Sequence, residues 1–237
     1  MIRRSAFKAL PLVAALLVAG LTACRPVSAT SDFVKLPAPA VDAPKMAAAH
    51  DQVAVLAGGC FWGIEAVFEH VKGVHKVTAG YSGGDADTAH YDEVSDGNTG
   101  HAESVQVQFD PAQVSYGQLL QVFFSVALDP TELNRQGPDS GTQYRSVIFY
   151  GNDEQKKIAS NYIAQLTTAK SFPAPIVTQV VPLKAFYPAE AYHQHYFQLH
   201  PNNPYIVFND APKVAHLQQL FPELYQPDQQ FVEVQLH

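Results

Sequence analysis

Apolar residues along the chain repeat with two different periods, which separate expected strands from expected helices. Short runs rich in β-branched and aromatic residues predict strands at residues 53–57, 74–81, 102–109, 145–150 and 176–181. Apolar residues three and four positions apart predict helices at residues 61–70, 119–128 and 153–170. Ser115 and Gln118 have the spacing of a capping box ahead of the second helix, and Asp153 is expected to cap the third.

This order of elements, β-α-β-β-α-β-α-β, predicts an α+β fold. We expect a two-layer sandwich in which helices pack on a mixed or antiparallel sheet, with a ferredoxin-like core. A long C-terminal coil with short helices should follow, because Pro residues punctuate the chain after the last strand. A doubly wound nucleotide-binding fold is disfavoured, since the glycines at residues 80–84 match neither phosphate-loop spacing.

The N-terminus has the pattern of a secretory signal. Arg3, Arg4 and Lys8 form a positively charged start, and residues 9–21 form a short apolar run. That run falls short of the roughly 20 residues that a spanning helix needs, and Pro11 weakens a helix there. We therefore expect residues 1–23 to be a cleaved signal peptide, with a retained membrane anchor as the alternative.

The next four positions extend this interpretation. Leu21-Thr22-Ala23-Cys24 resembles the lipobox of bacterial lipoproteins. The resemblance implies cleavage before Cys24 and lipidation of Cys24, so that acyl chains would hold the protein durably on a membrane. Arg25 is not the Asp that favours inner-membrane retention, so the implied location is the outer membrane facing the periplasm. A soluble periplasmic protein is the alternative.

Three further regions follow the predicted signal. Residues 24–52 contain four prolines and neither period, which predicts a lipidated N-terminus and a flexible linker that reaches about 90 Å when extended. Residues 53–225 form one globular domain, and residues 226–237 form a Gln-rich tail. The composition, 47% hydrophobic and 16% charged, suits such a domain and argues against wholesale disorder.

The charge balance is acidic. The whole chain has a formal net charge of −7, and removing residues 1–23, which hold three cations and no acid, makes it about −10. Nucleic acid is therefore a poor partner, and contact with a membrane is expected only through the lipid anchor. We expect a monomer.

The chain has two cysteines, Cys24 and Cys60. If Cys24 is lipidated, Cys60 is the sole thiol of the mature protein and has no partner for an intramolecular disulfide. An unpaired cysteine in an exported protein indicates a reactive thiol. Cys60 also follows a predicted strand and the Gly58-Gly59 turn and begins a predicted helix, where unpaired N–H groups favour a thiolate. The alternative is a small buried hydrophobic residue.

A set of sequence motifs favours a reactive thiol at Cys60 over a buried hydrophobic residue. Gly59-Cys60-Phe61-Trp62-Gly63 resembles the signature of the A-type peptide methionine sulfoxide reductases. Further blocks of that family follow in its order, and the whole set spans about residues 55–205: Tyr81-Ser82-Gly83-Gly84, Gly100-His101-Ala102-Glu103, Asp129-Pro130-Thr131, Asn134-Arg135-Gln136-Gly137-Pro138-Asp139, Gly141-Thr142-Gln143-Tyr144-Arg145-Ser146 and Phe186-Tyr187-Pro188-Ala189-Glu190 with Tyr192-His193-Gln194. The resemblance implies reduction of the S epimer of methionine sulfoxide to methionine, protein-bound and possibly free.

The resemblance also assigns roles to individual residues. It implies catalytic roles for Cys60, Glu103, Tyr91 and Tyr144, and substrate binding by Phe61, Trp62 and Asp139. Cys60 would be the nucleophile, and Glu103 the acid that an apolar environment keeps protonated. The two tyrosines would hold the sulfoxide oxygen, and the aromatic pair would accept the S-methyl group. Without the resemblance, Glu103 would be interpreted as a surface carboxylate, and the tyrosines and Trp62 as residues of the hydrophobic core.

These residue types suit the chemistry of a sulfoxide. Its oxygen is a poor leaving group unless it is protonated or strongly hydrogen-bonded, so the site needs a nucleophile, an acid and donors. Attack on sulfur would leave Cys60 as a sulfenic acid. One thiol would then form a mixed disulfide with it, and a second would restore Cys60.

The sequence departs from many relatives in one respect, because no resolving cysteine follows Cys60. Recycling must use an external thiol, for which we expect a thioredoxin-like protein in the cell and dithiothreitol in vitro, or Cys24 if it is not lipidated. No bound cofactor is expected. His193, His195 and His200 could suggest a metal site, but no metal is expected, since positions two apart do not share a helix face and no second carboxylate–His pair supports the three histidines. The Tyr192-His193-Gln194 block is expected to brace the pocket.

Two other functions fit the sequence less well. A Cys–His acyl-transfer or peptidase site could use His101 or His193, and would need no reductant. A non-catalytic surface lipoprotein would not depend on Cys60. The grouping of Cys60, Phe61 and Trp62 with Glu103 favours sulfoxide chemistry over both.

Overall fold

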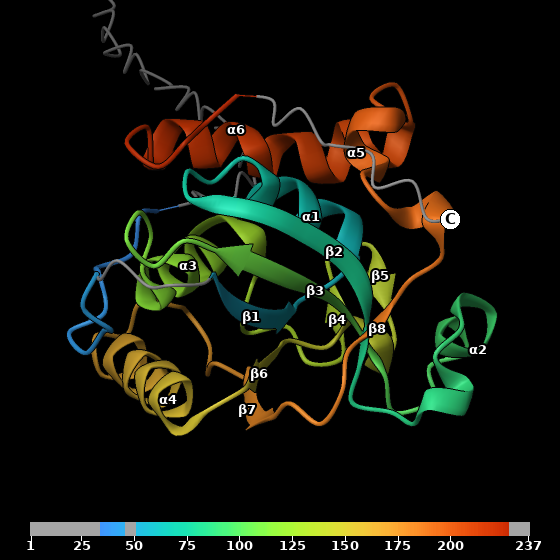
Figure 1. Cartoon of the computed structure of the whole chain (residues 1–237), viewed down its shortest axis with the longest axis horizontal. Helices are drawn as coiled ribbons and strands as arrows, with labels where there is room; N and C mark the ends of the chain where they lie inside the picture. The colour runs from blue at the N-terminus through green and yellow to red at the C-terminus, as the bar shows by residue number, and fades with distance from the viewer. Residues whose placement is uncertain (1–33, 46–50, 228–237) are drawn as a thin grey trace, which may run out of the picture. The chain divides into compact units, whose positions relative to one another are not determined.

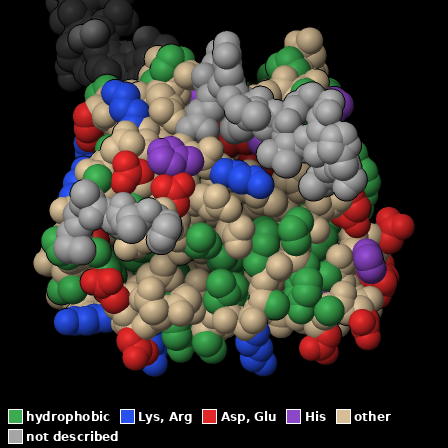
Figure 2. All heavy atoms as spheres, viewed as in Figure 1, with side chains coloured by type: hydrophobic (Ala, Val, Ile, Leu, Met, Phe, Trp, Pro, Cys, Tyr) green, Lys and Arg blue, Asp and Glu red, His purple; other side chains and the backbone are tan. Residues whose placement is uncertain are grey.

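The computed structural model describes residues 34–45 and 51–227. The predicted signal peptide, Cys24 and most of the predicted tail lie outside these residues. Within the described ranges, no helix combines the length and the apolar character needed to cross a bilayer. On the face drawn in Figure 2, acidic and basic side chains are interspersed.

The secondary structure follows the predicted order. The strands are β1 Gln52–Ala57, β2 Val74–Ser82, β3 Ala102–Phe109, β4 Arg135–Gln136, β5 Asp139–Ser140, β6 Val147–Tyr150, β7 Gln179–Pro182 and β8 Tyr187–Pro188. The α-helices are α1 Phe61–Glu69, α2 Tyr91–Ser95, α3 Tyr116–Val122, α4 Asp153–Thr168, α5 Tyr196–Leu199 and α6 Ala211–Leu220. Two π-helical segments are η2 Phe123–Ala127 and η5 Ile206–Asp210, and short 3-10 turns are η1 Ala86–Thr88, η3 Thr142–Tyr144 and η4 Ala191–His193.

Six strands form one mixed sheet in the order β7-β6-β1-β3-β2-β8 (Figure 1). The neighbours β6, β1, β3 and β2 are antiparallel, and only β6 and β7 pair in parallel. The inner four strands, with α1 after the first and α3 after the third, have the connectivity of a ferredoxin-like core. The predicted α+β class is therefore confirmed.

Helix α1 packs on the inner strands of this sheet, and α6 lies along α1 (Figure 1). Ile64, Val67 and Phe68 of α1 are fully buried, and each contributes about 1.5–3 kcal/mol by leaving water. Along β3, residues 103, 105, 107 and 109 share the face that α1 covers, because strand side chains alternate. This alternation places Glu103 beside the start of α1.

The structure differs from the predicted elements in several places. The helix predicted at residues 119–128 begins earlier, at Tyr116, and after Val122 it continues as the π-helical η2. Helix α2 was not predicted, because its five residues are too few to show a period. Asn152, rather than Asp153, caps α4, with its side chain accepting the N–H of Gln155 at 2.9 Å. The last long strand begins at Gln179, later than predicted, because it is a short edge strand placed by pairing with β6.

The predicted linker is not free over residues 34–45. Leu36 is buried, its carbonyl accepts from Gln121 Nε2 at 2.7 Å, and Tyr162 Oη donates to the Pro37 carbonyl at 2.8 Å. Asp42 accepts from Ser115 Oγ at 2.5 Å and from the Gly117 N–H at 2.8 Å. The prediction of a flexible tether is therefore wrong for these residues, because polar groups of α3 and α4 bind their backbone and Asp42.

The capping box of α3 is confirmed and is larger than predicted. Ser115 Oγ accepts the N–H of Gln118 at 3.1 Å, and Gln118 Oε1 accepts the N–H of Ser115 at 3.2 Å. Asp42 adds a third partner, since it accepts from both the cap hydroxyl and the first turn of the helix. A carboxylate here also complements the positive end of the helix dipole.

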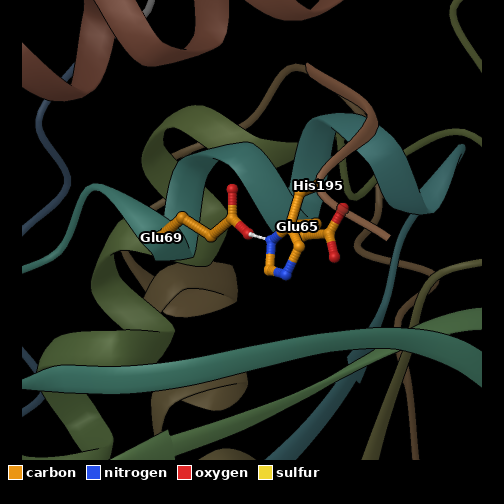
Figure 3. A group of neighbouring side chains, drawn as sticks. All are labelled: Glu65, Glu69 and His195. Carbon is orange, nitrogen blue, oxygen red and sulfur yellow. Dashed lines mark hydrogen bonds and ion pairs between the residues drawn. The ribbon is translucent and has the colours of Figure 1, made fainter. Parts of the chain in front are cut away.

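A buried group of titratable side chains lies on α1, one to two turns after its start. Glu65 and Glu69 are fully buried, and Figure 3 shows both beside the ring of His195. Glu69 Oε1 lies 2.6 Å from His195 Nδ1, and one ligand-type atom from each of the three residues lies within 4.8 Å of the others. Burial raises the pKa of both carboxyl groups from 4.5 to about 8. At neutral pH the carboxyl groups of Glu65 and Glu69 are therefore mostly protonated and uncharged.

This group predicts alkaline destabilisation. A carboxyl whose pKa is raised on folding adds stability fully below pH 4.5, and that stability is lost as pH rises through about 8. The melting temperature should fall between pH 6 and pH 9 by about 2–4 °C for each kcal/mol lost. Glu69→Gln should flatten this decline, whereas the exposed control Glu154→Gln should not. A melting temperature with the same pH slope in wild type and Glu69→Gln would contradict the assignment.

The packed segment 34–45 predicts a second effect on stability. Asp42→Ala removes both bonds to the N-terminus of α3 and should lower the free energy of unfolding by about 1–2 kcal/mol. Urea denaturation measures this change, with the exposed Asp87→Ala as the matched control. Equal stability of the Asp42 variant and wild type would mean that the segment is not held in solution.

Candidate active site

All seven predicted site residues other than Cys24 line one pocket of about 200 Å³. An eighth lining residue, Tyr205, was not singled out from the sequence. The pocket is formed by Cys60, Phe61, Trp62, Tyr91, Glu103, Asp139, Tyr144 and Tyr205. These side chains come from the start of α1, from β3 and β5, from α2 and η3, and from the C-terminal segment. The tertiary fold thus brings together residues that lie up to 145 positions apart.

Cys60 occupies the N-cap position of α1, directly after the turn that ends β1. The turn requires glycine at position 59, where φ is +98° and a Cβ would lie 2.6 Å from Gln136 Cγ. Cys60 is 8% exposed and lines the pocket. The local sequence therefore determines where the thiol sits, and the pocket determines what reaches it.

Burial dominates the electrostatics of this thiol. It raises the pKa of Cys60 well above its ordinary value, and the carboxyls of Glu103 and Asp210 raise it further. The Trp62 N–H and the Lys213 ammonium act in the opposite direction. The expectation of a favoured thiolate is therefore wrong, because burial raises the pKa of Cys60. The N-terminus of the helix acts as expected, but desolvation of the sulfur outweighs it.

Glu103 is the buried acid of the pocket. It is 3% exposed, and burial raises its pKa from 4.5 to about 8, against the opposing effect of the Phe61 N–H. That N–H donates to Glu103 Oε2 at 3.0 Å, which ties the carboxyl to the first residue of α1. At neutral pH the Glu103 carboxyl group is therefore mostly protonated. In this state it can donate a proton to a bound oxygen.

Three tyrosine hydroxyls surround the acid and the thiol. Burial raises the pKa of Tyr91, Tyr144 and Tyr205, so all three remain hydroxyl donors. Tyr205 donates a hydrogen bond to Asp139 Oδ2, and burial raises the pKa of Asp139 despite that bond. The pocket thus offers several neutral donors to an oxygen that gains charge.

Trp62 is held on three sides. Its Nε1 donates to His193 Nδ1 at 3.2 Å, and its ring stacks on Tyr196 with centroids 3.7 Å apart and planes at 6°. Tyr205 meets it edge-on, with ring centroids 5.9 Å apart. Phe61 completes the aromatic wall at a centroid distance of 6.4 Å from Trp62. A rigid apolar wall of this kind suits a methyl–sulfur group.

Residues 190–194 contact the elements that form the pocket: His193 accepts from Trp62, as the expected bracing by residues 192–194 requires. Gln194 bonds both backbone groups of Ala79 on β2, at 2.9 and 3.0 Å. Glu190 was not assigned a role from the sequence. It accepts from the N–H of Tyr91 at 3.0 Å and from Tyr81 Oη at 2.9 Å, and so places the start of α2 over the pocket.

The two histidines that an acyl-transfer site could use are not among the residues that line the pocket. His101 Nδ1 accepts from the Gly84 N–H at 3.2 Å, and its Nε2 lies 2.9 Å from the Asp85 carbonyl. His193 Nδ1 accepts from Trp62. A pocket lined by a thiol and a buried carboxylic acid, with no histidine among its lining residues, fits attack on a protonated oxide better than attack on a carbonyl.

Glu190 and Tyr205 were missed because each acts through a non-local contact. The Pro204-Tyr205 pair follows a run of asparagines, which indicates a turn but not what the ring touches. Glu190 lies inside a block of family motifs, and that block was the one available signal.

Known proteins resemble this chain over almost the whole described domain. The profile of the peptide methionine sulfoxide reductase family matches residues 52–224. A peptide methionine sulfoxide reductase MsrA 2 of Mesorhizobium japonicum is 62% identical over 179 residues, which covers 76% of this chain and 92% of the relative. An MsrA of Thermus thermophilus is 48% identical over 177 residues, 75% of this chain and 99% of the relative.

Solved structures agree with the sequence comparison. The chain resembles reduced Mxr1 from Saccharomyces cerevisiae with a TM-score of 0.58 and 34% identity, over 65% of this chain and 88% of that one. It resembles methionine sulfoxide reductase A of Corynebacterium diphtheriae with a TM-score of 0.56 and 31% identity, over 73% and 91%. With a family profile that spans 52–224 and a pocket that joins the motif residues, this chain belongs to the peptide methionine sulfoxide reductase family.

Proposed function

We propose that this chain reduces the S epimer of methionine sulfoxide to methionine, in oxidised proteins and peptides and in the free amino acid. The observation that carries the proposal is the placement of a lone thiol, Cys60, and a protonated carboxyl, Glu103, in one aromatic-walled pocket. Family membership supports the same reaction.

The reductive step needs a nucleophile for sulfur and a proton for oxygen. Cys60 attacks the sulfoxide sulfur as Glu103 and the thiol proton protonate the oxygen, so that an S–S bond forms, the S–O bond breaks and water leaves. Water then attacks the Cys60 sulfur, the S–S bond breaks and a proton returns to Glu103. Methionine leaves with its sulfur reduced, and Cys60 carries the oxygen of that water as a sulfenic acid. One sulfur gains the two electrons that the other loses, so the step balances without a cofactor.

Neutral donors stabilise the oxygen during this step. Tyr91 and Tyr144 line the pocket with their hydroxyls protonated, and each can hydrogen-bond the oxygen as its charge increases. Phe61 and Trp62 take the S-methyl group on the opposite wall. Polarisation of the S–O bond also assists Cys60, because it makes the sulfoxide sulfur more electrophilic toward a thiol whose pKa is raised by burial.

Regeneration of Cys60 requires an external thiol. Cys60 is the one cysteine among the described residues, and Cys24 is the other in the chain. We infer that a thioredoxin-like protein attacks the sulfenic acid, releases water and forms a mixed disulfide, which its second thiol then resolves. Dithiothreitol should replace it in vitro.

The N-terminal sequence supports a place for this activity outside the cytoplasm. We infer that the signal at residues 1–23 exports the chain and that Cys24 is lipidated, most simply at the outer membrane facing the periplasm. Residues 25–33 would then form the linker between the anchor and the packed segment that begins at residue 34. Metabolic labelling with a fatty-acid analogue in wild type and Cys24→Ser tests the lipidation.

The acid–nucleophile pair predicts a distinct pH profile. Glu103→Gln should lower kcat/KM for an S-sulfoxide at pH 7 by about 100-fold, because the proton donor is lost. In wild type the rate should fall as pH rises through about 8, where Glu103 loses its proton, and Glu103→Gln should lack that decline. Cys60→Ser should be inactive, and Glu154→Gln should match wild type. An R-sulfoxide as the better substrate would contradict the proposed stereochemistry.

The single thiol predicts the stoichiometry of a reaction without reductant. Wild type mixed with excess S-sulfoxide should release about one methionine per chain and become reactive toward dimedone at Cys60. Mass spectrometry of the tryptic peptide measures the adduct. Cys24→Ser should give the same result, which separates Cys60 from the second cysteine. Multiple turnovers without any added thiol would overturn the single-thiol cycle.

A further inference from the structure

One half-buried side chain, that of Arg145, joins two segments that carry pocket residues. Its Nη1 donates to the carbonyls of His101 and Thr142, both at 2.9 Å, and its Nη2 donates to the carbonyl of Gly100 at 2.8 Å. Gly100 and His101 lead into β3, and Thr142 begins η3. A single guanidinium group therefore links the start of β3 to η3.

Each of the two linked segments supplies a polar group to the pocket. Glu103 is the second residue of β3, and Tyr144 is the last residue of η3. Both side chains line the pocket, and they lie close enough that the Glu103 carboxyl adds to the effect of burial in raising the pKa of Tyr144. Arg145 is not among the lining residues. Its influence on these two groups therefore passes through the backbone that it binds.

The same turn also holds the helix above the pocket. Gln143 Nε2 donates to the carbonyl of Ser95 at 2.9 Å, and Thr142 Oγ1 donates to the carbonyl of Gly97. Both carbonyls lie at the end of α2, the helix that begins with Tyr91. The turn η3 and the arginine after it thus bind α2 and the start of β3, both of which supply polar groups to the pocket.

The three bonds of Arg145 use the shape of a guanidinium group. Its planar fork presents donors at fixed angles, whereas a lysine ammonium is a point charge on a flexible stem. None of the ion pairs within residues 34–45 and 51–227 includes Arg145, and its partners are carbonyl oxygens. A Cβ at Gly83, directly after β2, would lie 2.9 Å from Nη2, so glycine leaves room for the fork there.

We propose that Arg145 is a positioning residue for reduction of the sulfoxide: its guanidinium holds β3 and η3 together so that the Glu103 carboxyl and the Tyr144 hydroxyl reach the same oxygen. The proposal rests on the proposed function, because that function gives the two groups a shared target. Without the fork, β3 and η3 can shift relative to each other, and a small displacement of a proton donor slows the reaction strongly. Cys60 begins α1, which none of the three bonds reaches.

Single-turnover kinetics test this role without any reductant. The full chain with Cys24→Ser is mixed with increasing concentrations of an S-sulfoxide, and the release of methionine is timed. Arg145→Met should lower the saturating rate by about 30-fold and change the half-saturating concentration by less than about threefold, because the donors move while the aromatic wall stays. Arg145→Lys should remain about tenfold slow, since it keeps the charge but not the fork. The exposed control Lys157→Met should match wild type.

Two further measurements distinguish positioning from a general loss of structure. Alkylation of Cys60 by iodoacetamide at pH 8 should stay within about twofold of wild type in Arg145→Met, because the bonds of the guanidinium do not reach α1. Guanidinium ion at about 50 mM, far below denaturing concentrations, should raise the single-turnover rate of Arg145→Ala about fivefold and leave Lys157→Met unchanged.

The outcomes separate this proposal from the proposed function. A wild type that releases no methionine from an S-sulfoxide removes the function itself. An active wild type with an equally fast Arg145→Met or Arg145→Lys removes only the role of the guanidinium fork. An Arg145→Met chain that loses alkylation of Cys60 in proportion to its reductase rate, together with an Arg145→Ala chain that guanidinium does not rescue, shows a general structural role and also overturns the proposal.

Discussion

The structure depends on one constraint, the burial of a thiol and a carboxyl group in the same small pocket. The Phe61 N–H donates to Glu103 Oε2, and this bond joins β3 to the first residue of the helix that begins after Cys60. Because both groups leave water, both favour their neutral, protonated forms. A protonated carboxyl group and a protonated thiol can both donate protons to a sulfoxide oxygen. A neutral thiol is a weak nucleophile toward other compounds.

This constraint explains why so many neighbours are polar but uncharged. Tyrosine hydroxyls face the pocket with raised pKa values, and Trp62 is fixed by His193 and by stacking on Tyr196. These groups add donors and a firm apolar wall without adding charge. Asp210 and Lys213 form an ion pair beside Gly63, in the first turn of α1, and neither lines the pocket.

The surrounding fold keeps these parts in register. The C-terminal segment from β8 to α6 supplies Glu190, Tyr205 and Lys213, and it packs over the helix that carries the thiol. Near the N-terminus of the described residues, the segment 34–45 binds to α3 and α4. The packed domain therefore includes residues that precede its first strand, β1. If residues 1–23 are removed and Cys24 is lipidated, only a short stretch would separate the membrane from the packed domain.

The sequence by itself determined the main secondary-structure elements and most of the residues that line the pocket. Periodicity placed the four inner strands, the capping box of α3 and the helix after Cys60, because those features depend on neighbours a few residues apart. The resemblance to a known family named seven residues that the fold brings together in one pocket. Only the tertiary structure decided that Cys60 is held as a thiol, that Tyr205 completes the pocket, and that Lys213 lies beside Gly63. These properties depend on burial and on contacts between distant segments, which no local pattern encodes.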